Sequence, residues 1–97
     1  MINIAAKFPL GKLLMTRGVN DRIADDLQFS KFALGSLRRH ARGDWGAMCQ
    51  EDKTENNYSL DKRLRIFSAY EHPILPKIWI ITEADRSATT ILFPEEY

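Results

Sequence analysis

The sequence predicts a single α+β domain over residues 1–97, built from a short N-terminal strand, two to three helices and a C-terminal antiparallel β-meander. Three observations lead to this prediction. A chain of 97 residues has the length of one ordinary domain and can bury one core. Apolar residues recur with helical spacing in the middle of the chain. β-branched and aromatic residues gather in three runs in the last third, which is typical of strands.

The first half of the chain predicts one strand and two helices. The apolar run Lys12–Thr16 follows a Pro–Gly turn and predicts a short strand. Apolar residues four positions apart predict a helix over Val19–Leu27, with Asn20 as its N-cap. Ser30 is expected to cap a second helix, which carries an apolar stripe and runs to Ala41.

The second half predicts a third helix and three strands. Gly43 is a good stop for the second helix, and Asp44 is expected to cap a mostly polar helix over Ala47–Lys62. The three runs that predict strands are Leu64–Glu71, Lys77–Thr82 and Thr89–Phe93. The middle run is apolar on both faces, which is typical of a strand covered on both sides. Because the helices cover one side, we expect a dimer partner or a folded-over terminus on the other.

The composition is that of a globular protein without a membrane-spanning segment. Hydrophobic residues make up 44% of the chain and charged residues 28%, as in a globular protein. No apolar run approaches the roughly 20 residues that cross a bilayer, so no membrane partner is expected. The apolar start, Met1–Lys7, is too short for a signal peptide's apolar region and lacks the basic start. Cys49, the single cysteine, cannot form an internal disulfide, which agrees with a cytoplasmic location.

Charge is spread unevenly along the chain. From Met1 to Gly43, eight Lys or Arg stand against three Asp, a net charge of +5. From Asp44 to Tyr97, six basic residues stand against ten acidic ones, a net charge of −4. Such asymmetry indicates either an anionic partner for the basic half or mutual neutralisation of the two halves in the fold. Mutual neutralisation is the commoner case.

Several motifs resemble those of a known group of proteins. They are Phe8-Pro9-Leu10-Gly11, Gly43-Asp44-Trp45-Gly46 after His40, Glu51-Asp52-Lys53, Ser68-Ala69-Tyr70 and the run Trp79–Thr90. Together they resemble a family of small proteins carried by bacterial plasmids, phages and integrated elements, generally labelled plasmid-related. The resemblance implies an accessory role in a mobile element, without a known activity. Within the motifs, structural roles are expected for Asp44, Trp45, Ser87, Thr89 and Thr90.

The polar connection Thr82–Thr90 is the first candidate for chemistry. Glu83, Asp85 and Arg86 bring acid and base groups together beside hydroxyls, which suits acid–base or phosphate chemistry. The same residues also suit a structural turn. In that interpretation Asp85 and Ser87 bond to nearby backbone N–H groups and Glu83 pairs with Arg86. The structural interpretation is the stronger one.

His40 is the second candidate. Beside Asp44 it could act as a general base, or be held by the carboxylate in one tautomer. Alternatively, His40 simply ends a helix and Trp45 anchors the following turn in the core. If His40 met the Glu83–Thr90 loop, the two would resemble the parts of a metal-independent ribonuclease.

A basic stripe on the second helix is the third candidate. Lys31, Arg38 and Arg42 share one face, with Arg39 beside them. Two short consecutive helices resemble a helix-turn-helix, which reads DNA with its second helix. A solvated basic face that pairs with the acidic third helix is the commoner meaning.

These observations favour a non-enzymatic protein-binding module of a mobile element. The first alternative is a nucleic-acid-binding module that uses the basic stripe, and the second is a small metal-independent nuclease or toxin-like enzyme. With two histidines and one cysteine, neither a metal site nor a cofactor is expected. Both a monomer and a homodimer remain open.

Overall fold

The computed structural model describes residues 6–97 and shows an α+β fold. The apolar start of the chain, on which the signal-peptide expectation depends, lies mostly outside the described residues. Within the described residues the elements follow the expected order. They are β1 (Lys12–Met15), α1 (Arg17–Asp25), α2 (Leu27–Ala41), α3 (Gln50–Lys62), β2 (Ile66–Tyr70), β3 (Ile78–Thr82), β4 (Ala88–Leu92) and a 3₁₀ turn (Pro94–Glu96).

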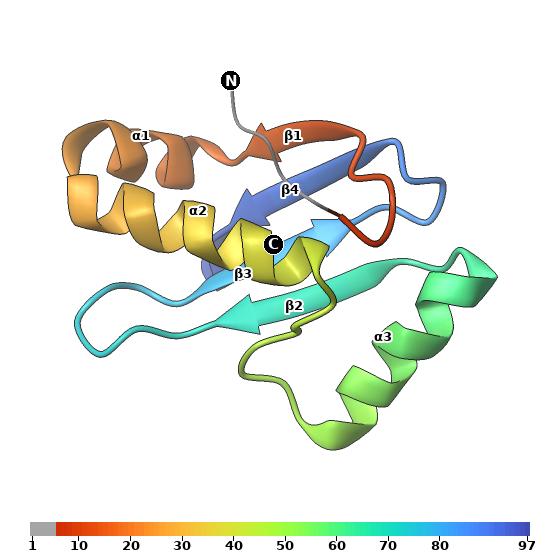
Figure 1. Ribbon diagram of the computed structural model, residues 1–97. Coiled ribbons are helices and arrows are strands. Elements are labelled where there is room, and N and C mark those ends of the chain that lie inside the picture. The colour runs from red at the N-terminus through yellow and green to blue at the C-terminus, as the bar shows by residue number, and fades with distance from the viewer. Residues whose placement is uncertain (1–5) are drawn as a thin grey trace.

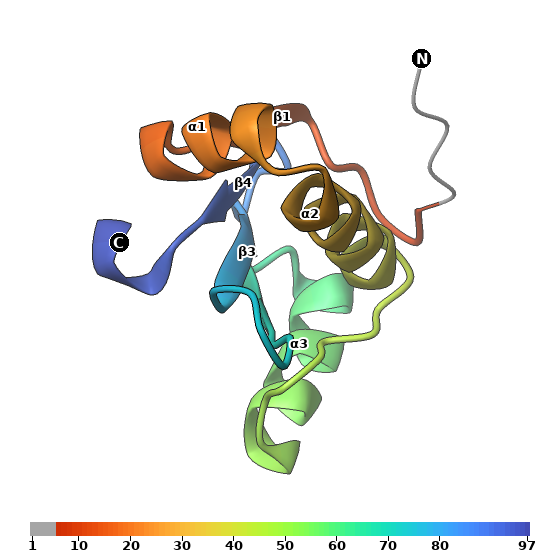
Figure 2. The same cartoon turned by 90° about the vertical axis from the view of Figure 1, so that its left-hand side faces the viewer.

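The strands described form one sheet in the order β1-β4-β3-β2. β2, β3 and β4 are the expected antiparallel meander, whereas β1 pairs with β4 in parallel. α2 crosses one face of the sheet, the C-terminal turn lies on the opposite face, and α3 lies beside the β2 edge (Figures 1 and 2). β1 and α3 therefore occupy opposite edges of the sheet.

The main core lies between α2 and the sheet. Phe29 and Leu37 of α2 pack with Ile78, Ile80 and Ile91 of β3 and β4, and all five side chains are buried. This packing explains why Ile78 and Ile80 are both apolar, because residues two apart in a strand share a face and this face of β3 lies against α2.

The opposite face of β3 carries Trp79 and Ile81. Ile81 is buried and Trp79 is half-buried, with the Tyr97 ring 5.8 Å from the Trp79 ring. The C-terminal turn thus supplies part of the second cover, as a folded-over terminus.

Three expected helix caps are wrong. The residue before α3 is Cys49, and Asp44 instead accepts from the Gly46 N–H. Asn20 lies inside α1, which begins after Thr16, and Ser30 lies inside α2. Asp26 separates the two helices because its carboxylate accepts a hydrogen bond from the Phe29 N–H at 3.1 Å. That bond satisfies a free donor of the first turn and lowers the pKa of Asp26 below its ordinary value.

The third helix starts at Gln50, three residues later than expected, because the preceding segment protects the sheet. The Trp45 carbonyl accepts from the Ala69 N–H, and the Ala69 carbonyl accepts from the Ala47 N–H. The Asn56 side chain bonds both the N–H and the carbonyl of Phe67. The outward backbone groups of β2 at Phe67 and Ala69 are thus satisfied, so this edge cannot accept another strand there.

Gly46 makes this protection sterically feasible. Its φ is +74°, and a Cβ atom at this position would overlap the Ala69 carbonyl oxygen. Gly35 lies inside α2, and a Cβ atom there would meet no atom within 4 Å beyond its chain neighbours and the nearby backbone of its own helix.

We predict opposite effects for the matched variants Gly46→Ala and Gly35→Ala. Gly46→Ala should lower the free energy of unfolding by about 3 kcal/mol or more, because it adds both a clash and a left-handed non-glycine residue. Gly35→Ala should raise it by about 0.5–1 kcal/mol through helix propensity. Urea denaturation measures both, and a neutral Gly46→Ala would contradict the close approach.

Candidate functional site

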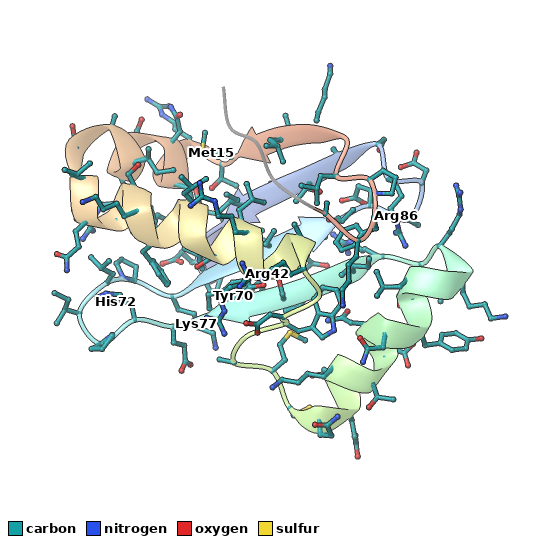
Figure 3. All side chains as sticks on the ribbon, in the orientation of Figure 1. Met15, Arg42, Tyr70, His72, Lys77 and Arg86 are labelled. Atoms are coloured by element: carbon teal, nitrogen blue, oxygen red, sulfur yellow. The ribbon has the colours of Figure 1, made fainter. Side chains whose placement is uncertain are left out.

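Arg86 lies in the connection between β3 and β4 and is buried, with 7% of its surface exposed. Its guanidinium donates to the Leu64 carbonyl at 2.7 Å and to the Ser59 carbonyl at 2.9 Å. It also donates to the carbonyls of Glu83 and Ala84 within its own turn. Arg86 therefore joins the β3–β4 turn to the C-terminal end of α3 and the residues that follow it (Figure 3). Burial lowers its pKa from the ordinary value.

The acidic residues of the same connection have separate partners. The Asp85 carboxylate accepts from the Ser87 N–H at 2.9 Å, as expected of a structural turn, and hydrogen bonding from Ser87 lowers the pKa of Asp85. The Glu83 carboxylate lies 3.8 Å from Arg65, so the expected Glu83–Arg86 ion pair is wrong. Arg86 instead donates to backbone carbonyls, two of them in its own turn and two in the region where α3 ends.

His40 lies in the last turn of α2 and is fully buried. Its Nδ1 contacts the Ser68 hydroxyl, and its Nε2 lies 2.9 Å from Thr82 Oγ1. Thr82 Oγ1 lies 2.7 Å from Thr89 Oγ1, and the Thr89 hydroxyl donates to the Leu10 carbonyl at 2.7 Å. A continuous hydrogen-bond chain thus runs from β2 through His40 and β3 to β4 and the segment before β1.

One end of this chain fixes the proton positions along it. The Leu10 carbonyl can only accept, so Thr89 donates to it and Thr82 must donate to Thr89. The Thr82 oxygen then accepts from Nε2–H of His40, which leaves Nδ1 to accept from Ser68. We infer the neutral Nε2–H tautomer from this order. Burial lowers the pKa of His40 to about 3, so the ring is uncharged at neutral pH.

The expected partnership between His40 and Asp44 is not present. The Asp44 carboxylate lies 2.8 Å from Arg39, and this interaction lowers the pKa of Asp44 and raises that of Arg39. Trp45 is buried and donates from Nε1 to the Asn57 side chain at 3.0 Å, as an anchor of the turn.

His40 and Arg86 are close in space without facing a common opening. The His40 ring lies 5.5 Å from the Phe8 ring, and the Arg86 guanidinium lies 5.8 Å from the same ring. Both groups are buried and hydrogen-bonded to the protein. Of the ribonuclease parts, the structure therefore brings His40, Thr89 and Arg86 near one another, while Glu83 and Asp85 bond elsewhere.

The basic stripe of α2 is mostly exposed. Arg39 is engaged, since it pairs with Asp44 and stacks 5.0 Å from the Tyr70 ring. Lys31, Arg38 and Arg42 are exposed. The expected pairing of this stripe with the acidic third helix does not occur among the described residues. The ion pair that the stripe makes is with Asp44, in the connection before α3.

An apolar groove beside β1 is a feature that the sequence reasoning missed. Leu13, Leu14 and Met15 are 48%, 45% and 44% exposed. Pairing with Thr89 and Ile91 of β4 puts Leu13 and Met15 on the face that α2 covers. The groove has a volume of about 270 Å³ and is lined by residues of β1, α1, α2 and β4. The sequence feature that could have indicated it is the run of three consecutive apolar residues in the predicted first strand.

Within residues 6–97, no strand pairs with the outer edge of β1. The N–H groups of Lys12 and Thr16 donate to the Ser87 and Ile91 carbonyls on the β4 side. Because backbone groups alternate along a strand, the N–H groups of Leu13 and Met15 point away from β4. Among residues 6–97, no hydrogen bond to these outward groups is present.

Comparisons with protein-family models, with curated proteins and with solved structures found no match. Among the residues that the structure describes, no helix is long and apolar enough to cross a membrane, and no group of His, Cys, Asp or Glu could hold a metal ion. Functional inference therefore depends on the geometry of this fold.

We predict that Arg86→Ala is strongly destabilising. The variant removes a buried guanidinium that donates to four backbone carbonyls and joins the β3–β4 turn to the segment after α3, so the free energy of unfolding should fall by about 3 kcal/mol or more. Arg65→Ala is the matched control, because Arg65 is half-exposed and its ion pair should contribute less than about 1 kcal/mol. Thermal unfolding compares them, and equal small losses would contradict the structural role of Arg86.

We also predict a pH dependence that originates in His40. Because its folded pKa of about 3 lies below the ordinary 6.5, the unfolded chain binds the proton more readily. Its contribution is complete above pH 6.5 and declines toward pH 3, with a slope of up to about 1.4 kcal/mol per pH unit.

Urea denaturation between these pH values measures how steeply the free energy of unfolding changes with pH. The control variant His72→Gln should have the same slope as the wild type. In His40→Gln the slope should decrease by up to about 1.4 kcal/mol per pH unit, which corresponds to one proton. Nitrogen NMR provides a second readout in the wild type, where the His40 ring should keep its Nε2–H tautomer at pH 5. A charged His40 ring at that pH would contradict the buried chain.

Proposed function

We propose that this chain is a non-enzymatic protein-binding module that accepts an extended segment of a partner protein as an added strand on β1. One observation carries the proposal: β1 combines an open backbone edge with three exposed apolar side chains, Leu13, Leu14 and Met15. An added strand would satisfy the outward backbone groups and cover the apolar groove at the same time.

The contrast between the two edges of the sheet supports this function. Natural proteins protect edge strands with charges, proline, bulges or a covering segment. At β2 the protection is complete at Phe67 and Ala69, through Asn56 and the segment around Gly46. At β1 the edge bears an apolar run instead, which marks a surface for association.

The contacts of the polar candidates also favour binding over catalysis. His40 is buried and both of its ring nitrogens are occupied by the fold's own hydroxyls. Arg86 is directed at four backbone carbonyls, and Asp85 holds its own turn. These groups stabilise the domain, and none of them is presented to a substrate.

A role in a bacterial mobile element is part of the same proposal. It is supported by the resemblance of the Gly43–Gly46 and Trp79–Thr90 motifs to small plasmid-related proteins. Residues of both motifs contribute to folding here, through the covered β2 edge and the buried hydrogen-bond chain. A partner encoded by the element or by its host is expected to bind at β1.

Peptide display tests the binding mode. A library of random extended peptides is selected on the wild-type protein, with a fluorophore on Cys49, which is exposed and directly precedes α3. Selected peptides should bind at least about tenfold more weakly to Leu13→Lys/Met15→Lys, because lysines charge the groove and protect the edge. Peptide binding should slow the hydrogen exchange of the Leu13 and Met15 amides.

Ile74→Lys provides the matched control. Ile74 is 73% exposed in the β2–β3 connection, far from β1, so the variant introduces a similar change from apolar to charged. It should bind the selected peptides as the wild type does. Peptides that bind all three proteins equally, or that leave the β1 amides unprotected, would overturn the proposed site.

A further inference from the structure

The β1 groove is bordered by positive charge, and this charge defines the chemistry of its partner. We infer that the bound segment is an extended strand in which apolar residues alternate with acidic ones. This inference rests on the proposed function and deepens it, because it names the class of ligand. It depends on where the basic residues lie relative to the groove and on how little of their charge is neutralised.

The α2 side of the groove carries two basic residues. Leu34 lines the groove, and Lys31 and Arg38 lie three and four positions away on the same helix surface. Both are exposed, and neither takes part in an ion pair among the described residues. They therefore stand one turn on either side of an apolar groove residue, with their charges directed to solvent.

The strand itself adds a third positive charge. Lys12 pairs with Ala88 and Leu14 with Thr90, so both lie on the sheet face opposite to Leu13 and Met15. Lys12 is exposed. A partner strand beside β1 would thus contact the apolar groove, bordered by Lys31 and Arg38, on one face of the sheet. On the other face it would contact Lys12 and Leu14.

The fold preserves the charge asymmetry of the sequence. The segment up to Gly43 carries a net charge of +5 and contains β1, α1 and α2. Two of its three aspartates are already paired, Asp21 with Arg17 and Asp26 with Arg22. Among ion pairs of the described residues, Arg39–Asp44 alone joins the basic segment to the acidic one. At the end of β1, the Glu96 carboxylate of the C-terminal turn accepts from Thr16 and from the Gly18 N–H. The positive charge therefore borders the groove at Lys12, Lys31 and Arg38, where it can attract an acidic segment.

The same charges disfavour two other occupants. An antiparallel pair of β1 strands from two copies would bring Lys12, Lys31 and Arg38 of both copies to one interface, and none of the three is in an ion pair among the described residues. Nucleic acid usually stacks its bases on aromatic rings, yet the groove is lined by aliphatic and small side chains. An acidic–apolar peptide satisfies both the groove and its border.

Three synthetic peptides test the inference by fluorescence anisotropy. One alternates valine with glutamate, the second alternates valine with threonine, and the third alternates valine with lysine. The glutamate peptide should bind about tenfold more tightly than the threonine peptide at low salt, and the lysine peptide most weakly. The preference should shrink as salt rises from about 50 to 200 mM, because rim charges are screened.

Matched charge variants locate the effect. Lys31→Ala/Arg38→Ala should bring the glutamate peptide to within about threefold of the threonine peptide. Lys53→Ala/Lys62→Ala removes the same charge from α3, at the other edge of the sheet, and should keep most of the preference. Both variants are checked for an unchanged melting temperature.

The outcomes separate the two proposals. Equal binding of the glutamate and threonine peptides, with both sensitive to Leu13→Lys/Met15→Lys, would overturn the acidic specificity and leave strand addition intact. Binding that ignores Leu13→Lys/Met15→Lys would overturn the β1 site itself. A single-stranded oligonucleotide that displaces the glutamate peptide, and that binds through Lys31 and Arg38, would contradict a peptide as the partner. Light scattering that shows a dimer which excludes the peptide would contradict it too.

Discussion

The buried hydrogen-bond chain centred on His40 is the interaction on which the rest of the fold depends. It links the end of α2 to β2, β3 and β4 and ends at the Leu10 carbonyl, just before β1. A buried polar group without a partner is costly, so each link tolerates only one arrangement of its neighbours. Next to Leu10, Gly11 adopts a φ of +66° against the backbone of Ser87, which carries the chain into β1. The position of β1 beside β4 therefore follows from polar contacts in the core.

Arg86 closes the other side of the domain by a similar rule. A buried guanidinium needs several oxygen acceptors, and backbone carbonyls of Ser59 and Leu64 supply them at the end of α3. The Ser59 carbonyl also accepts from the Leu64 N–H, so the backbone and Arg86 together close the end of α3. Arg86, which resembles a catalytic group in the sequence, thus bonds the backbone of its own fold. The motif around it in the β3–β4 connection contributes to folding.

The functional consequence is an asymmetric sheet. One edge is sealed by a side chain and a turn that imitate a neighbouring strand, and its neighbourhood is acidic. The other edge is open, apolar and bordered by lysine and arginine. α3, which carries acidic residues, and β1 lie at opposite edges of the sheet (Figure 1). Binding at β1 needs no change in the core, since the outward groups of Leu13 and Met15 already point away from β4.

The sequence by itself determined the class, order and approximate bounds of the elements, because helical spacing, strand runs and a stop such as Gly43 are local signals. It also indicated that β3 is covered on both faces. Only the tertiary structure decided the caps, the partners of His40 and Glu83, the parallel pairing of β1, and which edge stays open. Those features depend on contacts such as His40–Thr82 and Trp45–Ala69, between residues far apart in the chain. Local patterns carry no record of such contacts, so the surface that we propose for binding became visible only once the strands were ordered.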